Sequence, residues 1–493
     1  MDDFSPDVYP VHVLDKIKAN HCYVDWLMHF NDVLDAEKLN AALSRLLEIG
    51  DWKKLGGRLQ RKASCNMHSA TTGERQITSI LSRRTEVSKY TSQDHLQQGS
   101  KIFDMNIDEH PVASRLPKKT ESPSIQTLSP DTRPLIARPD FPTFEEMVRK
   151  GLPSISLHIT SFRDATLVAL IWPHVLMDAI GAKSLLEAWS SVLAGREEDV
   201  PPVLGAREDM LRSTGAMHEG DTPEEFGLEK WRLKGISMIM FLLRFVWNKF
   251  WNPRRERRIF LLPKSDFGKI REQARMDVPR GSGVDEEPFI SDSDILTAWL
   301  ARAVASSEPG SRPFTVLNLM NARYRIPSLL KSGGAFIQNM VLGTYSFFSS
   351  QLPEKSVGSI ALEYRKNFTE QATQGQTLCF LRSVFRDLEA GRSPGLLFGE
   401  SNAALVAFNN LLKADLIRNV DFSPAVMSQG EATQTRANPP GSMVFYYNEA
   451  IDDSFNEFNL FVVLGQDHRD TYWVLGTLLP RAWKKIEEDL GRI

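Results

Sequence analysis

Two apolar runs joined by a short polar link constrain the fold of this chain more than any other feature. PSISLHITSF (153–162) and TLVALIWPH (166–174) are rich in β-branched and aromatic residues, and RDA (163–165) separates them. This spacing predicts a β-hairpin. After His174, apolar residues recur at helical spacing until Gly195, which acts as a stop signal. A strand therefore brings His174 to a strand-to-helix junction.

The length of the chain and the alternation of its elements indicate its organisation. At 493 residues the chain is too long for one small core, so we expect two large domains. Strand-like and helix-like runs alternate, which predicts an α/β fold with mixed sheets flanked by helices. We place an N-terminal domain at 1–205, a crossover with an apolar helix at 206–258, and a C-terminal domain at 259–493.

Composition and charge exclude several functional classes. A hydrophobic content of 42% with 25% charged residues is typical of a globular protein rather than a disordered or membrane-embedded one. The formal charge of −3 creates no field that would by itself gather nucleic acid or an anionic membrane. The cysteines, Cys22, Cys65 and Cys379, lack metal-ligand spacing. We expect them to be reduced and structural, and we expect neither a metal site nor a nucleic-acid partner.

Neither the start of the chain nor its most apolar segment has the features of a secretory signal or a membrane span. MDDFSPDVYPVHVLDK (1–16) lacks a basic n-region and an apolar h-region, which predicts a cytoplasmic protein. GISMIMFLLRFVWNKFW (235–251) is interrupted by Arg244, Asn248 and Lys249, so we expect no stable membrane insertion. Two interpretations of this segment stay open. It is either a long helix packed across two domains, or an amphipathic surface helix that dips into a membrane interface or caps an apolar tunnel.

The string IWPHVLMDAIG (171–181) carries the most direct signal of chemistry. A histidine at the end of an apolar strand can titrate near neutrality and reach into a cleft. An imidazole that accepts the proton of an alcohol during attack on a carbonyl accelerates the reaction by about 10²–10⁴. Asp178 could orient the imidazole of His174, or it could brace the turn by pairing with a distant cation. Spacing alone does not choose, and an isolated histidine after a strand also fits a satisfied core residue.

The residues His174, Asp178 and Gly181 form an HxxxDxxG string that resembles the active-site signature of the BAHD acyltransferases. The resemblance is strongest to their fungal branch, which includes the trichothecene acetyltransferases. Other segments match the family in the same order along the chain. They are KKLGGRLQ (53–60), similar to the AGRL segment; LNLMNARYRIPSLL (317–330), similar to the N-x-R-x-R-x-P segment; AFIQNMV (335–341), similar to the G-N motif; and NVDFSPAV (419–426), at the place of D-F-G-W-G.

Two positions bear on which subfamily the chain resembles. Only Asp421 and Phe422 of D-F-G-W-G are retained, and Ser423 begins the part that differs. Since that motif is structural in the family, the departure puts the subfamily in doubt more than the chemistry. Pro173 stands where nonribosomal condensation domains usually carry a second histidine, which favours a coenzyme A donor over a carrier-protein thioester.

The resemblance implies two domains of chloramphenicol-acetyltransferase type, with a solvent channel between them and His174 at its middle. His174 would be the general base, and no covalent acyl-enzyme would form. Asp178 would point away from the substrate and pair with Arg323. We choose Arg323 over Arg325 because Asn321 aligns with the asparagine of the N-x-R match.

The resemblance also assigns structural roles and one further candidate for catalysis. The motif residues expected to be structural are Gly181, Asn321, Asn339, Asp421 and Phe422. A donor must hold the tetrahedral oxyanion, and backbone N–H groups of 421–425 or the Ser423 hydroxyl could serve. The alternative is that this segment is a plain turn.

The implied activity is acyl-CoA-dependent O-acyl transfer to a specialised metabolite such as an alkaloid, terpenoid or polyketide. Acetyl-CoA is the commonest donor in similar fungal proteins, and an amine acceptor stays open. Acyl-CoA would be a co-substrate rather than a permanently bound cofactor, and the enzyme would be a monomer. Two alternatives are transfer of a carrier-protein-bound polyketide or peptide acyl group, and a catalytically inactive homologue that binds a ligand.

Overall fold

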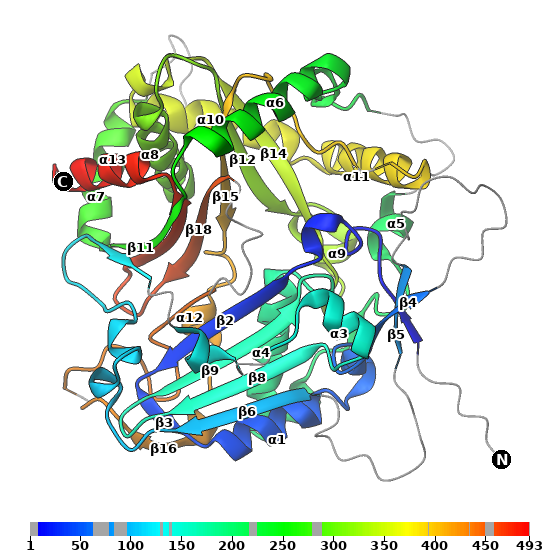
Figure 1. Ribbon diagram of the computed structural model, residues 1–493, viewed down its shortest axis with the longest axis vertical. Coiled ribbons are helices and arrows are strands. Elements are labelled where there is room, and N and C mark those ends of the chain that lie inside the picture. The colour runs from blue at the N-terminus through cyan, green and yellow to red at the C-terminus, as the bar shows by residue number, and fades with distance from the viewer. Residues whose placement is uncertain are drawn as a thin grey trace.

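The structure is a computed structural model whose two largest sheets lie one above the other in Figure 1. It describes residues 8–62, 78–82, 96–128, 132–137, 141–215, 224–278, 288–392, 394–432, 434–448 and 458–492. Within these ranges Cys22 and Cys379 are buried free thiols, and Cys65 lies outside them. The first seven residues of the chain, used above for the prediction of its location, also lie outside them.

The lower, five-stranded sheet contains the hairpin predicted from the sequence. Its order is β17–β2–β9–β8–β6, and β8 and β9 pair antiparallel, which confirms the hairpin. Every residue of β9 is buried, so both faces of this strand are covered. The strands are β17 (Phe445–Tyr447), β2 (Tyr23–Phe30), β9 (Thr166–Pro173), β8 (Ile155–Ser161) and β6 (Leu96–Ile102), the last of which is parallel to β8.

Helices α1 (Ala36–Leu46) and α4 (Ala179–Leu193) pack against each other and support the lower sheet. Asp35 caps α1 by accepting a hydrogen bond from the backbone N–H of Lys38 at 3.0 Å. The indole of Trp189, in α4, is fully buried and donates to the carbonyl of Leu39 in α1 at 3.1 Å. This packing holds the start of α4, and with it the turn after β9, in place.

The upper, seven-stranded sheet has helices over one face and its own core. Its order is β14–β12–β15–β18–β19–β11–β7. The strands are β14 (Val341–Phe348), β12 (Phe314–Asn321), β15 (Ala404–Asn410), β18 (Asn459–Gln466), β19 (Tyr472–Leu478), β11 (Glu256–Leu262) and β7 (Ser124–Thr127). The helices that share its core are α7 (Lys264–Met276), α8 (Asp292–Ser307), α10 (Val357–Gln371) and α13 (Pro480–Leu490).

Each half of the chain contributes a strand to the sheet of the other half. β7, from the N-terminal part, is the edge strand of the upper sheet beside β11. β17, from the C-terminal part, pairs with β2 in the lower sheet, and β16 (Val426–Gln429) pairs with β3 (Asp32–Leu34). The domain ranges expected from the sequence did not include these exchanged strands. Pairing between distant segments leaves no local signal in composition.

Smaller elements connect and flank the two sheets. β10 (Val203–Leu204) and β13 (Ala335–Phe336) form a short parallel pair between the two halves of the chain. The others are β1 (Val8–Pro10), β4 (Arg58–Lys62) and β5 (Thr78–Ser82) in a three-stranded sheet, and α2 (Arg133–Ile136), α3 (Phe144–Lys150), α5 (Met210–Gly215), α9 (Pro327–Leu330), α11 (Gln374–Glu389) and α12 (Leu416–Asn419).

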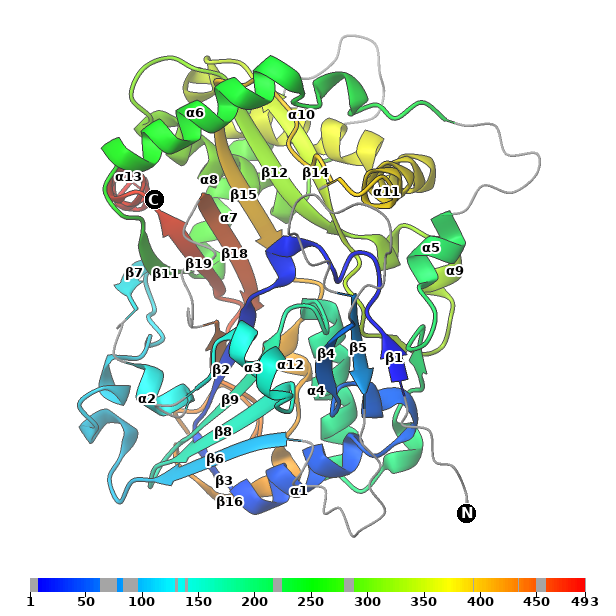
Figure 2. The same ribbon diagram turned by 45° about the vertical axis from the view of Figure 1, so that its right-hand side comes forward.

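The apolar segment forms helix α6 (Gly235–Trp251), which lies along the top edge of the molecule in Figures 1 and 2. None of its residues is buried, which does not fit the first interpretation, a long helix packed across two domains. Apolar periodicity shows that a helix has an apolar face, but it does not show whether other protein covers that face. No helix within the described residues is long and apolar enough to cross a membrane.

A buried ion pair fastens the exchanged C-terminal strands to the lower sheet. Arg436 donates from Nη1 and Nη2 to the two carboxylate oxygens of Asp32 at 2.5 and 2.6 Å, and the side chains are 3% and 0% exposed. Asp32 also accepts from the backbone N–H of Gly441 at 2.7 Å. One buried carboxylate therefore holds the segment between β16 and β17 at two points.

We expect Arg436→Ala to lower the free energy of unfolding by about 3–5 kcal/mol, because it leaves the Asp32 carboxylate buried without its cation. Urea unfolding followed by circular dichroism measures this change. Arg149→Ala, which removes an exposed pair with Glu146, is the control and should cost less than about 1 kcal/mol. Equal losses in the two variants would contradict the structural role of the buried pair.

Candidate active site

The turn after β9 holds His174 between the two halves of the chain. The backbone N–H of His174 donates to the carbonyl of Cys22 at 2.8 Å, which ties the turn to the start of β2. The side-chain amide of Asn339, from the C-terminal half, donates to the carbonyl of His174 at 2.8 Å. The indole of Trp172 donates to the carbonyl of Met177 at 3.2 Å and closes the turn. The main chain on both sides of the imidazole is thus fixed.

The His174 imidazole is half-buried and lines the cavity between the sheets. Burial lowers the pKa of His174, because the charged form loses hydration, although the nearby Asp178 carboxylate acts in the opposite direction. A lowered pKa favours the neutral form of the ring at pH 7. A neutral imidazole that faces a cavity can accept a proton.

Both carboxylate oxygens of Asp178 are occupied by groups other than the imidazole. Oδ1 accepts from the backbone N–H groups of Ile180 and Gly181 at 3.1 and 2.9 Å and caps α4. Oδ2 accepts from Arg323 at 2.6 Å and from the backbone N–H of Met340 at 2.9 Å. Of the two roles left open above, this geometry supports bracing of the turn.

Arg323 connects Asp178 to the C-terminal half of the chain. The side chains are 8% and 1% exposed, and the second guanidinium nitrogen of Arg323 donates to the carbonyls of Phe336 and Gln338 at 2.8 and 2.5 Å. Arg325 lies elsewhere, with its guanidinium 5.1 Å from the ring centre of Phe368. The pair thus involves the arginine chosen from the N-x-R match.

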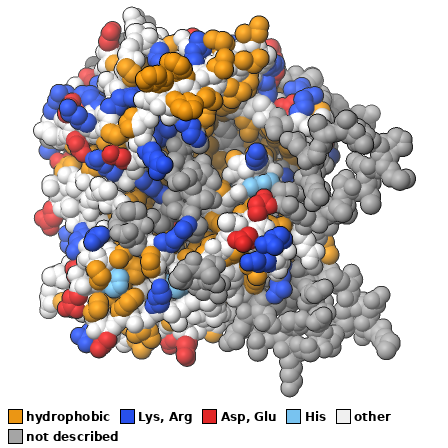
Figure 3. All heavy atoms as spheres, in the orientation of Figure 1, with side chains coloured by type: hydrophobic (Ala, Val, Ile, Leu, Met, Phe, Trp, Pro, Cys, Tyr) orange, Lys and Arg blue, Asp and Glu red, His pale blue; other side chains and the backbone are white. Residues whose placement is uncertain are grey.

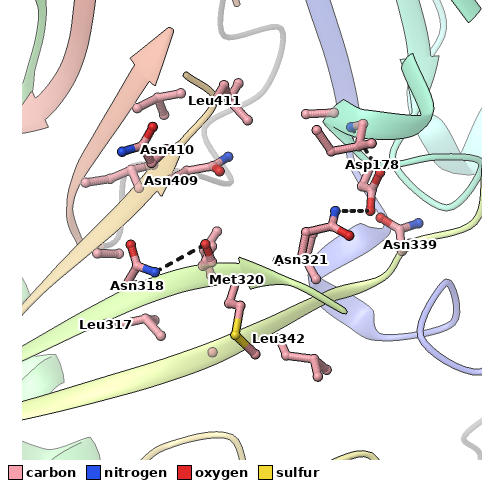
Figure 4. Close-up of a pocket in the computed structure, with 18 of the residues that line it drawn as sticks. Asp178, Leu317, Asn318, Met320, Asn321, Asn339, Leu342, Asn409, Asn410 and Leu411 are labelled. Carbon is pink, nitrogen blue, oxygen red and sulfur yellow. Dashed lines mark hydrogen bonds between the residues drawn. The ribbon is translucent and has the colours of Figure 1, made fainter. Parts of the chain in front are cut away.

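The contacts of Gly181 and Asn321 give a physical reason for these residue types at their positions in the motifs. A Cβ atom on Gly181 would lie 2.6 Å from the carbonyl oxygen of Ile337, so the helix and the facing strand approach too closely for a side chain. The side-chain oxygen of Asn321 accepts from the backbone N–H and the guanidinium of Arg323 at 3.0 and 3.2 Å. Asn321 also donates to Asp178 at 3.4 Å, the contact drawn in Figure 4.

A second buried network, which the sequence analysis missed, supports Asn339. Asp15 Oδ1 accepts from the backbone N–H and from the side-chain amide of Asn339, each at 2.8 Å. Burial raises the pKa of Asp15 to about 6, an effect that Lys54 opposes. The Lys54 side chain is itself buried beside His12, with 3.2 Å between Nζ and Nε2. Lys54 lies within KKLGGRLQ, the one signal that could have drawn attention to this network.

A cavity of about 1010 Å³ opens between the sheets beside His174. Residues from the lower sheet, such as Trp26 and Trp172, and from the upper sheet, such as Leu317 and Val462, line it. This size suits a ligand larger than a single small metabolite. The site therefore has room for two reactants that meet at the imidazole.

Asn318, Asn409 and Asn410, from two strands of the upper sheet, also line the cavity and were missed from the sequence. Asn318 lies in β12, and Asn409 and Asn410 end β15. Figure 4 shows them across the cavity from Asp178. Amide groups in an otherwise apolar pocket can orient a bound ligand. The signal was present as two asparagines closing an apolar run, VAFNN, but no motif singled it out.

The expectation that Ser423 holds the oxyanion is not supported by its position. Ser423 is exposed and is not among the described residues that line the cavity. Its backbone N–H donates to Asp421 at 2.9 Å, while Phe422 is fully buried, stacks on Phe30 and contacts Trp189. The segment is a turn that supports α4 from the side away from the cavity.

The chain is similar to known proteins over nearly its whole length. No family model matches the sequence. The chain is 31% identical over 505 residues to O-acetyltransferase PaAT-2 of Phomopsis amygdali, a match that covers 99% of this chain and 98% of the relative. It is 32% identical over 488 residues to acetyltransferase pyiB of Pyricularia grisea, which covers 98% and 93%. The solved structure of F. graminearum TRI101 complexed with ethyl coenzyme A covers 98% of each chain with a TM-score of 0.64 at 12% identity, which confirms the predicted fold.

Removal of the Arg323 guanidinium tests the brace of the turn. We expect Arg323→Ala to lower the free energy of unfolding by about 3–5 kcal/mol, since the Asp178 carboxylate stays buried without its cation. Chemical unfolding is the measurement. Arg325→Ala is the matched control, and its contact with the Phe368 ring is worth only about 1 kcal/mol. A larger loss for Arg325→Ala would contradict this assignment.

Proposed function

The chain belongs to the fungal branch of the BAHD-like acyltransferases, and from this premise we propose that it transfers an acyl group from acyl-CoA to the hydroxyl of a specialised metabolite. Acetyl-CoA is the proposed donor, since both relatives are named as acetyltransferases. The observation that carries the proposal is the neutral His174 imidazole facing a cavity shared by both sheets. A monomeric state and a cytoplasmic location stay predictions.

In the proposed reaction His174 is the general base. The imidazole accepts the proton of the acceptor hydroxyl as the oxygen attacks the thioester carbonyl, and a tetrahedral oxyanion forms. When this intermediate collapses, the carbon–sulfur bond breaks, and the thiolate of coenzyme A takes up the proton. The ester is the product, and no bond forms between the acyl group and the protein. Asp178 and Arg323 act through the turn that positions the imidazole.

The charges on the cavity wall support an anionic co-substrate. Among the residues that the structure describes, five cationic side chains line the cavity: Lys18, Arg257, Arg325, Arg365 and Lys413. The lining carboxylates, Asp178 and Asp294, both have an arginine partner. The wall is therefore positive although the chain as a whole carries −3. The phosphates of coenzyme A fit such a wall, and so does the phosphate of a carrier-protein arm. The assay below therefore compares the two donors.

Replacement of His174 tests the proposed base. We expect His174→Ala to lower kcat with acetyl-CoA and a panel of hydroxylated metabolites by about 10²–10⁴, the usual contribution of a general base. His468→Gln, in the turn between β18 and β19, is the control and should keep the activity of the unaltered chain. Full turnover by His174→Ala would end the assignment. Turnover with an acyl-carrier protein alone would replace acyl-CoA as the donor.

The dependence of the rate on pH gives a second, independent measurement. The base acts when neutral, and burial lowers the pKa of His174 below its ordinary value of about 6.5. We therefore expect kcat/KM to fall on the acid side with a midpoint below pH 6.5. Circular dichroism over the same range separates this decline from unfolding. A midpoint above pH 6.5 in folded protein would contradict a base with a lowered pKa.

A further inference from the structure

The apolar side of α6 faces away from the protein, the reverse of an ordinary surface helix. Its large apolar side chains are among the most exposed of the described residues, with Ile236 at 80%, Trp247 at 64%, Phe250 at 84% and Trp251 at 71%. A continuous strip of hydrophobic surface follows the helix along the top edge in Figure 3. Most proteins cover such a patch with a partner.

A polar contact and one aromatic contact hold the opposite side of α6 against the upper sheet. Arg244 donates from Nη1 to the hydroxyl of Ser401 at 2.9 Å. The ring of Phe245 lies 5.2 Å from that of Phe458, which lines the cavity. The helix is thus fixed with its apolar side outward, and its inner side contacts the wall of the cavity.

We propose that α6 docks on the surface of a membrane that contains anionic phospholipids. The helix has 17 residues and is about 25 Å long, so it lies in the plane of the headgroups rather than crossing them. Trp247 and Trp251 stand at its end with their ring centres 5.5 Å apart, and tryptophan is enriched at the interface between headgroups and acyl chains. Each feature matches an interfacial helix.

The charges around α6 complement an anionic surface. No aspartate or glutamate lies between residues 230 and 255, whereas Lys249 and Arg254 are exposed at the same end as the tryptophans. Lys234, at the start of the helix, is paired with Glu229, so the positive charge lies at the end that carries the tryptophans. A cation near an anionic bilayer surface contributes about 1 kcal/mol to binding. These local cations supply the attraction that the net charge of −3 does not.

The same charges disfavour a second copy of this chain as the partner. A two-fold dimer through α6 would place the same patch of each copy against the other. Residues 235–254 carry Arg244, Lys249 and Arg254 and no acidic side chain, so both patches would be positively charged.

Sedimentation of the full chain with lipid vesicles tests the proposal. We expect binding to vesicles of phosphatidylcholine mixed with phosphatidylserine, weaker binding to phosphatidylcholine alone, and loss of binding at high salt. Phe250→Ser with Trp251→Ser should lower the partition coefficient more than about tenfold, because these side chains supply the buried apolar area. Lys249→Gln and Arg254→Gln should each lower it about fivefold.

Matched variants test whether binding depends on α6 itself or on any exposed apolar side chain. Ile102→Ser and Met276→Ser remove side chains that are 84% and 73% exposed on other elements, and they should bind vesicles like the unaltered chain. Absence of sedimentation with either vesicle would overturn the proposal, as would an equal loss in the two sets of variants. Light scattering without lipid reports the mass, and a dimer that Phe250→Ser with Trp251→Ser converts to a monomer would identify a second copy as the partner instead.

Discussion

The buried pair between Asp178 and Arg323 is the interaction on which the site depends. It joins the turn after β9 in the lower sheet to the segment after β12 in the upper sheet. A charge removed from water is tolerated only when its hydrogen-bonding capacity is met, and here backbone N–H groups and carbonyls surround both partners. The pair therefore sets the distance between the halves at the place where the cavity and the imidazole meet.

The network around Asn339 works beside this pair on the opposite flank of the turn. Asn339 connects the carbonyl of His174 to the buried carboxylate of Asp15, so the residues on either side of the imidazole are held from the C-terminal half. The imidazole itself is left facing the cavity.

The exchanged strands make the two halves one unit. β7 completes the upper sheet and β17 the lower one, so neither sheet is whole without the distant part of the chain. The buried pair of Arg436 with Asp32 secures the returning segment. Helix α6 differs from the other long helices, because its large apolar side chains are exposed and none of its residues is buried.

The sequence by itself determined the local elements and the residues of the motif. The hairpin, the helix after His174 and the helical character of 235–251 follow from periodicity, because the pitch of a helix and the alternation of a strand are local properties. Matching motifs also pointed to Arg323 and Asn339. Only the tertiary structure decided that Ser423 lies away from the cavity, that Asp15 and Lys54 are buried together, and which way α6 faces. These are relations between segments up to hundreds of residues apart, and no local pattern records the direction in which two surfaces meet.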